Sequence, residues 1–168
     1  MAAEPWEDEL TRGLAQRFGN RIERFATYLG QKFLVADAGA LPELLKCLLD
    51  EWEFDALVDL TAVDYPARTS RFELVYILYS YSRNERVRVK CSVGLGERAP
   101  SVCAVHPAAN WMEREVYDMF GIEFANHPDL RRLLMPEDWQ GFPLRRDENI
   151  LAMDNRWVKE NLGIESGQ

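Results

Sequence analysis

The stretch RFELVYILYSYSRNERVRVKCSV, residues 71–93, decides the fold. Its first part, 71–81, is apolar at nearly every position, which is typical of a central strand covered on both faces. Its last part, 86–93, alternates strictly between small apolar residues and arginine, lysine or serine, which is typical of a strand with one buried face. The residues between them, 82–85, predict a hairpin turn. Together they predict the centre of a β-sheet.

The residues before this hairpin predict helices and shorter strands. Residues 6–18 place apolar side chains at steps of four with charged residues between them, which predicts an amphipathic helix. Segment 21–38 is rich in β-branched and aromatic residues and is broken by Gly30, so it predicts two short strands around a turn. From Leu41 a second helix is predicted, with Pro42 in its first turn and one apolar face formed by leucines.

The remaining elements are a strand at 56–65, a short strand at 101–105 and a third helix. Asn110 is the predicted N-cap of that helix, with Glu113 at the position from which a carboxylate reaches back to the cap. Gly121 is expected to end it. This order of elements predicts an α+β, two-layer domain with one mixed, twisted β-sheet packed by helices.

The domain is expected to span residues 1–125 and to be followed by an extended C-terminal arm over 126–168. Prolines and glycines interrupt any regular period in the arm, yet a disordered tail should be poor in large apolar residues. Two interpretations remain open: the apolar residues anchor the arm in grooves of another protein, or the arm folds back on its own domain. These residues are Leu133, Leu134, Met135, Trp139, Phe142, Ile150, Leu151 and Trp157.

Composition excludes several classes of protein. The chain has 168 residues and a formal charge of −8, so no general attraction to nucleic acid or anionic lipid is expected. The N-terminus lacks the pattern of a signal peptide and no apolar run approaches the length of a membrane span, so a soluble, unexported chain is expected. The three cysteines are far apart in sequence and are interpreted as reduced, buried thiols.

No catalytic or metal-binding motif is evident. The two histidines, His106 and His127, each precede a proline and lack the spacing of metal ligands, so each is expected to shape a turn. Glu113 and Glu115 are two residues apart on a helix and point about 200° from each other, so they cannot act as an acid and base pair. A free-standing enzyme would have to use one of these glutamates or His127 with partners from elsewhere in the fold.

Several motifs resemble the signature of the C subunit of the proton-pumping NADH-quinone oxidoreductase, respiratory complex I. They are ERE at 113–115, DMFG at 118–121, HPDLRRLL at 127–134 and GFPLRRD at 141–147. Over residues 113–147 the resemblance is specific, whereas over residues 23–112 it is a resemblance of pattern only. Phe142 departs from it, because the family often has histidine there; this argues against a proton-related role for the position.

The resemblance implies an unfused, cofactor-free and non-catalytic component of the peripheral arm, which would scaffold the quinone-site subunit during electron transfer from NADH to quinone coupled to proton translocation. FMN and iron–sulfur clusters would lie in other subunits. The expected partners are the D subunit, which resembles a hydrogenase large subunit, and also the B subunit. The expected location is the cytoplasmic side of the bacterial inner membrane, with membrane contact only through the complex.

An alternative within the same resemblance is the equivalent subunit of a membrane-bound hydrogenase or of a ferredoxin- or coenzyme-dependent complex. In either case the site residues fall into two groups. The arginine pairs of the partner-binding group are expected to bind carboxylates of the partner, the alternative being a solvated surface. The partner-binding group is His127, Arg131, Arg132, Leu133, Leu134, Trp139, Phe142, Arg145 and Arg146. The structural group is Glu113, Arg114, Glu115, Asp118, Phe120 and Gly121.

Overall fold

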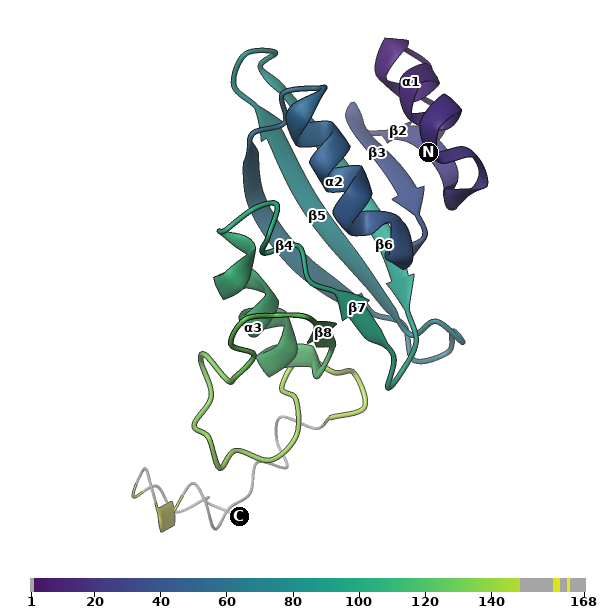
Figure 1. Ribbon diagram of the computed structural model, residues 1–168. Coiled ribbons are helices and arrows are strands. Elements are labelled where there is room, and N and C mark those ends of the chain that lie inside the picture. Colours follow the sequence, from purple (N-terminus) through teal and green to yellow (C-terminus); the bar gives the residue numbers. More distant parts are fainter. Residues whose placement is uncertain (1, 149–158, 161–162, 164–168) are drawn as a thin grey trace.

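A computed structural model describes residues 2–148, 159, 160 and 163. Over this part of the chain the α-helices and strands follow one another in the order seen in Figure 1. They are β1 (Glu4–Pro5), α1 (Glu9–Phe18), β2 (Ile22–Tyr28), β3 (Gln31–Ala36), α2 (Leu41–Asp50), β4 (Ala56–Asp64), β5 (Phe72–Ser80), β6 (Glu85–Val93), β7 (Arg98–Pro100), α3 (Ala109–Phe120) and β8 (Glu123–Ala125).

The main sheet is mixed, with the strand order β1-β2-β3-β6-β5-β4. Strands β5 and β6 form the predicted antiparallel hairpin, and β3 joins β6 in parallel. The pair β2 and β3 turns at Gly30, and α2 carries Pro42 in its first turn, as the sequence predicted. The predicted α+β fold with one mixed sheet is therefore confirmed.

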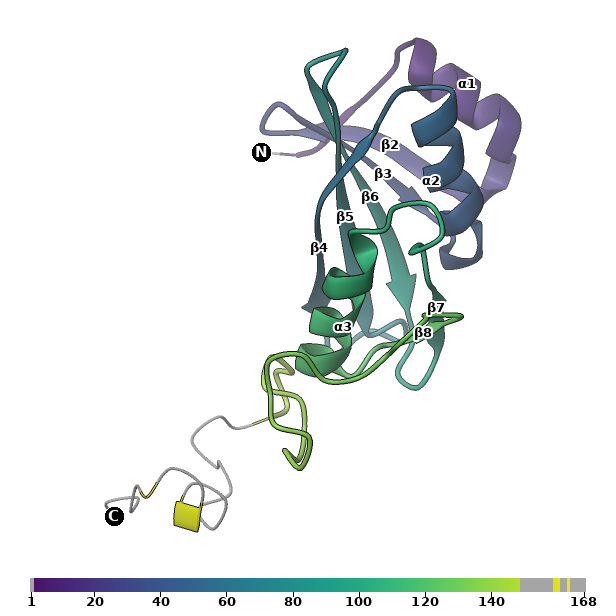
Figure 2. The same cartoon turned by 60° about the vertical axis from the view of Figure 1, so that its left-hand side comes forward.

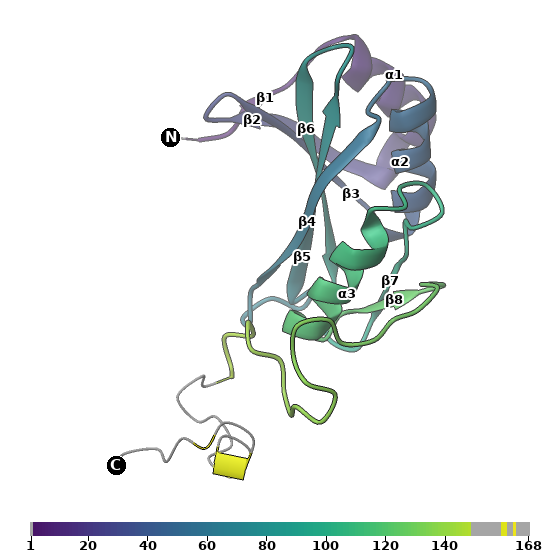
Figure 3. The same ribbon diagram turned by 90° about the vertical axis from the view of Figure 1, so that its left-hand side faces the viewer.

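All the labelled helices lie on one face of this sheet, as Figures 2 and 3 show. Side chains of β5 that point toward the helices are almost completely buried, among them Leu74, Tyr76 and Leu78. On the other face Ile77 and Tyr79 are only half-buried. The prediction that β5 is covered on both faces is therefore wrong. Apolar residues are tolerated on this helix-free face of the sheet because long cationic side chains from β6 lie beside them.

The strand predicted at 101–105 is also absent from the structure. The amides of Val105 and His106 both donate to the carbonyl of Val102, at 2.9 Å each, so these residues form a tight turn. The extended residues lie just before it, where β7 pairs in parallel with β8 as a separate two-stranded sheet. A five-residue apolar run is too short for periodicity to distinguish a strand from a buried turn.

Residues 126–148 contain no helix or strand, and through residue 147 they are fastened to the domain by the bonds described below. In Figure 1 this segment runs beneath α3. An extended arm is thus not supported over these residues; the interpretation that the arm folds back describes them better. Ile150, Leu151 and Trp157 of the predicted arm lie outside the described residues. No helix in the described part of the chain is long and apolar enough to cross a membrane.

Candidate functional site around helix α3

Helix α3 carries the ERE and DMFG motifs, and its two ends differ in how well the sequence predicted them. Gly121 ends the helix in the left-handed conformation with φ 72°, as expected. The predicted cap at Asn110 is wrong, because the N-cap is Ala108 and no side chain caps this end. The amide of Ala109 instead donates to the carbonyl of His106 at 2.9 Å, so the helix starts two residues earlier than predicted, directly after the turn.

Two faces of α3 are buried. Val116, Met119 and Phe120 pack into the core on the face toward the sheet. The face that carries Arg114 and Asp118 is buried as well, with 6% and 0% of the two residues exposed. It packs against the chain that follows β8, so the charged positions of the motif anchor residues 127–147. We call residues 127–147 the anchored segment.

Asp118 holds the centre of the anchored segment. One carboxylate oxygen accepts the backbone amides of Leu133, Leu134 and Met135 at 3.0, 2.7 and 2.8 Å, and the other accepts Arg132 at 2.7 Å. Burial by itself would raise the pKa of this carboxyl, but the three amides and the guanidinium stabilise the charged form and lower the pKa below its usual value. Asp118 therefore fixes the course of the backbone over these residues.

One arginine of α3 and one arginine of the segment itself bind backbone carbonyls of the anchored segment. Arg114 donates to the carbonyls of Arg131 and Arg132 at 3.2 and 3.1 Å. Arg132 in turn donates to the carbonyls of Trp139 and Gly141 at 3.0 and 3.1 Å. Since a guanidinium has five donors in a planar fork, each arginine can satisfy several carbonyls of a chain that has no regular hydrogen bonding of its own.

The end of the helix holds the second half of the segment. Arg145 donates to the carbonyl of Phe120 at 2.6 Å, and its guanidinium lies 4.3 Å from the centroid of the Phe142 ring. A Cβ atom on Gly121 would stand 2.5 Å from Arg145 and 2.6 Å from the Phe142 ring. Glycine is therefore required at this position both for its positive φ and for this close approach.

A buried ion pair fastens the end of the segment to strand β4. Arg71 binds the carboxylate of Asp64 with two hydrogen bonds, at 2.7 and 2.8 Å, and binds Asp147 at 2.8 and 2.5 Å. The amide of Arg146 also donates to Asp64 at 2.8 Å. These bonds with Arg71, opposed by burial, lower the pKa of Asp64. The sequence contains no local signal for the bonds to Asp147, because Arg71 and Asp147 are 76 residues apart in the chain.

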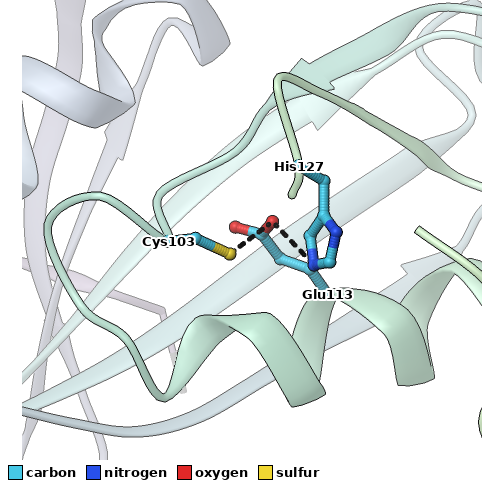
Figure 4. Close-up of side chains that lie close together, drawn as sticks. All are labelled: Cys103, Glu113 and His127. Carbon is cyan, nitrogen blue, oxygen red and sulfur yellow. Dashed lines mark hydrogen bonds and ion pairs between the residues drawn. The ribbon is translucent and has the colours of Figure 1, made fainter. Parts of the chain in front are cut away.

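Glu113 is the most deeply buried group of the ERE motif, and Figure 4 shows it between Cys103 and His127. It accepts the amide of Val102 at 2.7 Å and the thiol of Cys103 at 3.4 Å. Burial raises the pKa of Glu113, although these hydrogen bonds act against it. Burial also raises the pKa of Cys103, to about 11, so the thiol is a poor nucleophile at neutral pH.

Cys103, Glu113 and His127 could each offer a ligand atom to a metal, and these atoms lie within 4.8 Å of one another. The histidine geometry argues against that use. Its Nδ1 accepts the amide of Asp129 at 3.0 Å and so carries no proton, which leaves the proton on Nε2, 3.1 Å from the carbonyl of Asn110. A metal-binding histidine instead donates its second nitrogen to an acceptor. The contacts made by His127 fit the turn that the sequence predicted.

The predicted partner-binding residues divide by exposure. Exposed residues are Arg131, Leu134 and Arg146, whereas Arg132, Leu133, Trp139, Phe142 and Arg145 are half-buried in the anchored segment. Of the predicted structural residues, only Glu115 is exposed, and it points away from the buried Glu113. Sequence reasoning missed Asp64, Arg71 and Cys103, and it gave no role to Asp147, which it named only within the motif at 141–147. The spacing of Asp64 and Arg71 across the loop between β4 and β5 was the only available signal for their pairing.

The fold resembles that of a known respiratory assembly. A chain of the membrane-bound sulfane sulfur reductase, an archaeal respiratory membrane complex, superposes with a TM-score of 0.74 and 25% identity, over 93% of this chain and 91% of that chain. This chain therefore belongs to a class of small α+β proteins. Another protein of this class is part of a respiratory membrane complex.

Sequence comparison identifies the family. Residues 34–153 match the model of the respiratory-chain NADH dehydrogenase 30 kDa subunit. The NADH-quinone oxidoreductase C subunit of Geotalea uraniireducens is 39% identical over 89% of this chain and 92% of the relative. The C subunit of Rhodopseudomonas palustris is 49% identical over 70% of this chain and 59% of the relative, so the chain matches about three-fifths of that protein. The chain belongs to the family of the NADH-quinone oxidoreductase C subunit, as its motifs suggested.

Proposed function

We propose that the chain is a non-catalytic, peripheral-arm component of NADH-quinone oxidoreductase that scaffolds the quinone-site D subunit and contacts the B subunit beside it. The observation that carries this proposal is that Arg114, Asp118 and Arg132 all use their hydrogen-bonding groups on the backbone of the anchored segment. Charged groups committed in this way fix the backbone of the anchored segment and so shape the surface that it presents.

The shaped surface has the composition of an interface. Leu134 and Leu144 are 62% and 55% exposed, although their backbone is held in place. The amide of Leu134 donates to Asp118, and the amide of Leu144 donates to the carbonyl of Met119 at 3.0 Å. Arg131 and Arg146 are exposed beside them. Exposed arginines beside apolar side chains on a fixed backbone fit a protein interface, because arginine is enriched in interfaces and a pre-organised surface loses little entropy on binding. We call Arg131, Leu134, Leu144 and Arg146 the docking surface.

Under this proposal FMN, the iron–sulfur clusters and the quinone pocket belong to other subunits, and the chain reaches the cytoplasmic face of the membrane only through them. Two observations support a role without chemistry of its own. The side chains of Glu113 and His127 are fully buried, and Glu115 points away from them. The motif glutamates and the histidine therefore do not converge on a site that a substrate could enter.

The proposal is tested by changing the docking surface without touching the bonds beneath it. The variants Arg131→Glu and Leu134→Asp are expressed in the native host, and the assembled complex is quantified by native electrophoresis of solubilised membranes. Both should lower the amount of complex several-fold and leave the melting temperature of the isolated chain within about 2 °C, since surface substitutions change stability little. Arg12→Glu, at an exposed arginine of α1, is the matched control. Normal assembly in both variants contradicts the proposal.

A second candidate is the equivalent subunit of a complex with another electron donor. The likeness to a chain of the sulfane sulfur reductase complex favours it. A membrane-bound hydrogenase or a ferredoxin- or coenzyme-dependent complex would fall in the same group. An assay of the purified complex distinguishes the two functions. Reduction of a quinone analogue by NADH indicates the first function. Activity with ferredoxin or hydrogen, without activity from NADH, indicates the second.

A further inference from the structure

The face of the main sheet that carries no helix is lined by cations. Cross-strand register places Arg86, Arg88 and Lys90 of β6 on the same face as Tyr79, Ile77 and Val75 of β5. Arg24 of β2 joins them, since it pairs with Val35, whose β3 register partner is Lys90. Figure 3 shows this face free of helices on the side opposite α1, α2 and α3. We call it the open face.

Most of these cations have no anionic partner within the part of the chain that the structure describes. Lys90 pairs with Glu73 at 2.8 Å, but neither Arg86 nor Arg88 forms an ion pair or hydrogen bond there. Arg24 makes only a contact with an aromatic ring, 5.2 Å from the centroid of Phe33. Unpaired arginines so close together repel one another, and the chain has 28 acidic residues that could have neutralised them.

The cations alternate with apolar side chains that remain partly accessible. Ile77 lies directly across from Arg88 and Tyr79 lies directly across from Arg86, and both apolar side chains are half-buried. Phe33 lies between Arg24 and Lys90, with the two cations 5.2 Å from its ring centroid. Neighbouring strands are about 4.8 Å apart, so the arginines and the apolar residues form a single mixed surface rather than separate patches.

We propose that the open face is a second docking surface, which binds an acidic surface of another protein subunit of the complex. Aspartate and glutamate of that subunit would pair with Arg24, Arg86 and Arg88, and its apolar side chains would cover Ile77 and Tyr79. The class of partner is inferred from charge complementarity. A guanidinium binds a carboxylate through two parallel hydrogen bonds, and removing half-buried aromatic and aliphatic groups from water adds to the affinity. This surface is separate from that of the anchored segment, which runs below α3 in Figure 3.

Two acidic residues limit the class of partner. Glu73 and Asp59 share the open face by register, and the whole chain has a charge of −8. A polyanion such as nucleic acid would meet these carboxylates along with the arginines, whereas a folded protein can place its acidic groups over the arginines alone. A protein partner with a local acidic patch is therefore favoured.

The test uses the assembled complex that contains the full-length chain. Arg88→Lys keeps the positive charge and supplies an amine, which a water-soluble carbodiimide joins directly to a carboxylate within contact distance. Mass spectrometry is expected to find position 88 linked to an aspartate or glutamate of another subunit. Arg12→Lys, the matched control on α1, should give no such link.

Charge reversal provides a second measurement. The double variant Arg86→Glu/Arg88→Glu should reduce the assembled complex roughly tenfold or more, because like charges that face each other across an interface repel. The isolated chain should keep its melting temperature within about 2 °C, since neither arginine has a partner among the residues that the structure describes.

The proposal is overturned if position 88 links only to its own chain or to a second copy of this chain. It is also overturned if charge reversal leaves assembly unchanged. Neither result affects the docking surface on the anchored segment, because that surface is tested by Arg131→Glu and Leu134→Asp. If those two variants lose assembly and the double variant assembles normally, the proposed function stands and the open face has no part in it.

Discussion

Replacing Asp118 with asparagine should release the anchored segment. In the wild type the fully buried carboxylate accepts three backbone amides and the guanidinium of Arg132. Asparagine is nearly the same size, but it has one acceptor oxygen, no charge and an amide nitrogen that faces donors. Removing one partner of a buried charged pair destabilises a protein by about 3–5 kcal/mol. We take about 3 kcal/mol, because detachment lets water reach the freed groups.

Hydrogen exchange measures this loss where it occurs. A loss of about 3 kcal/mol corresponds to roughly a 100-fold faster exchange of the amides of Leu133, Leu134 and Met135, if they open by detachment of the segment. The melting temperature should fall by about 6–12 °C if detachment is coupled to unfolding of the domain. Glu115→Gln removes a charge from an exposed position of the same helix and should change neither quantity.

The pH dependence provides an independent check. The pKa of Asp118 is lowered in the folded protein from its ordinary value of 3.8, so its stabilising contribution is complete above pH 3.8 and is lost as the pH falls through the lowered pKa. The stability difference between the wild type and Asp118→Asn should therefore shrink in strong acid. Unchanged exchange of the three amides, or a difference independent of pH, would refute the reasoning.

Three further predictions concern other residues of the site around helix α3. In Glu113→Gln, stability relative to the wild type should increase as the pH rises above 4.5 in urea titrations, because the raised pKa of Glu113 favours the folded state only while the group is protonated. Arg71→Met should lower the free energy of unfolding by about 3 kcal/mol, since it leaves the Asp64 charge buried and unpaired. Gly121→Ala should speed proteolysis of the anchored segment by displacing Phe142, whereas alanine at the open position Gly30 should not.

The sequence by itself determined the sheet, the helices and the family. Alternation and helical periodicity decide these features because they report which side of a strand or helix is buried, and that information is local. The hairpin of β5 and β6, the turn at Gly30 and the glycine that ends α3 could all be predicted in this way. The motif spacing identified the family, since several residue types had to match together.

Only the tertiary structure decided which face of the sheet the helices cover and where the anchored segment lies. Apolar residues on both sides of β5 predicted two covered faces, but periodicity cannot show that arginine side chains lie beside one of them. The roles of Arg114 and Asp118 depend on backbone groups 15 to 18 residues further along the chain. The pairing of Arg71 with Asp147 spans 76 residues. Such contacts have no period in the sequence, because they are set by how the finished layers bring distant segments together.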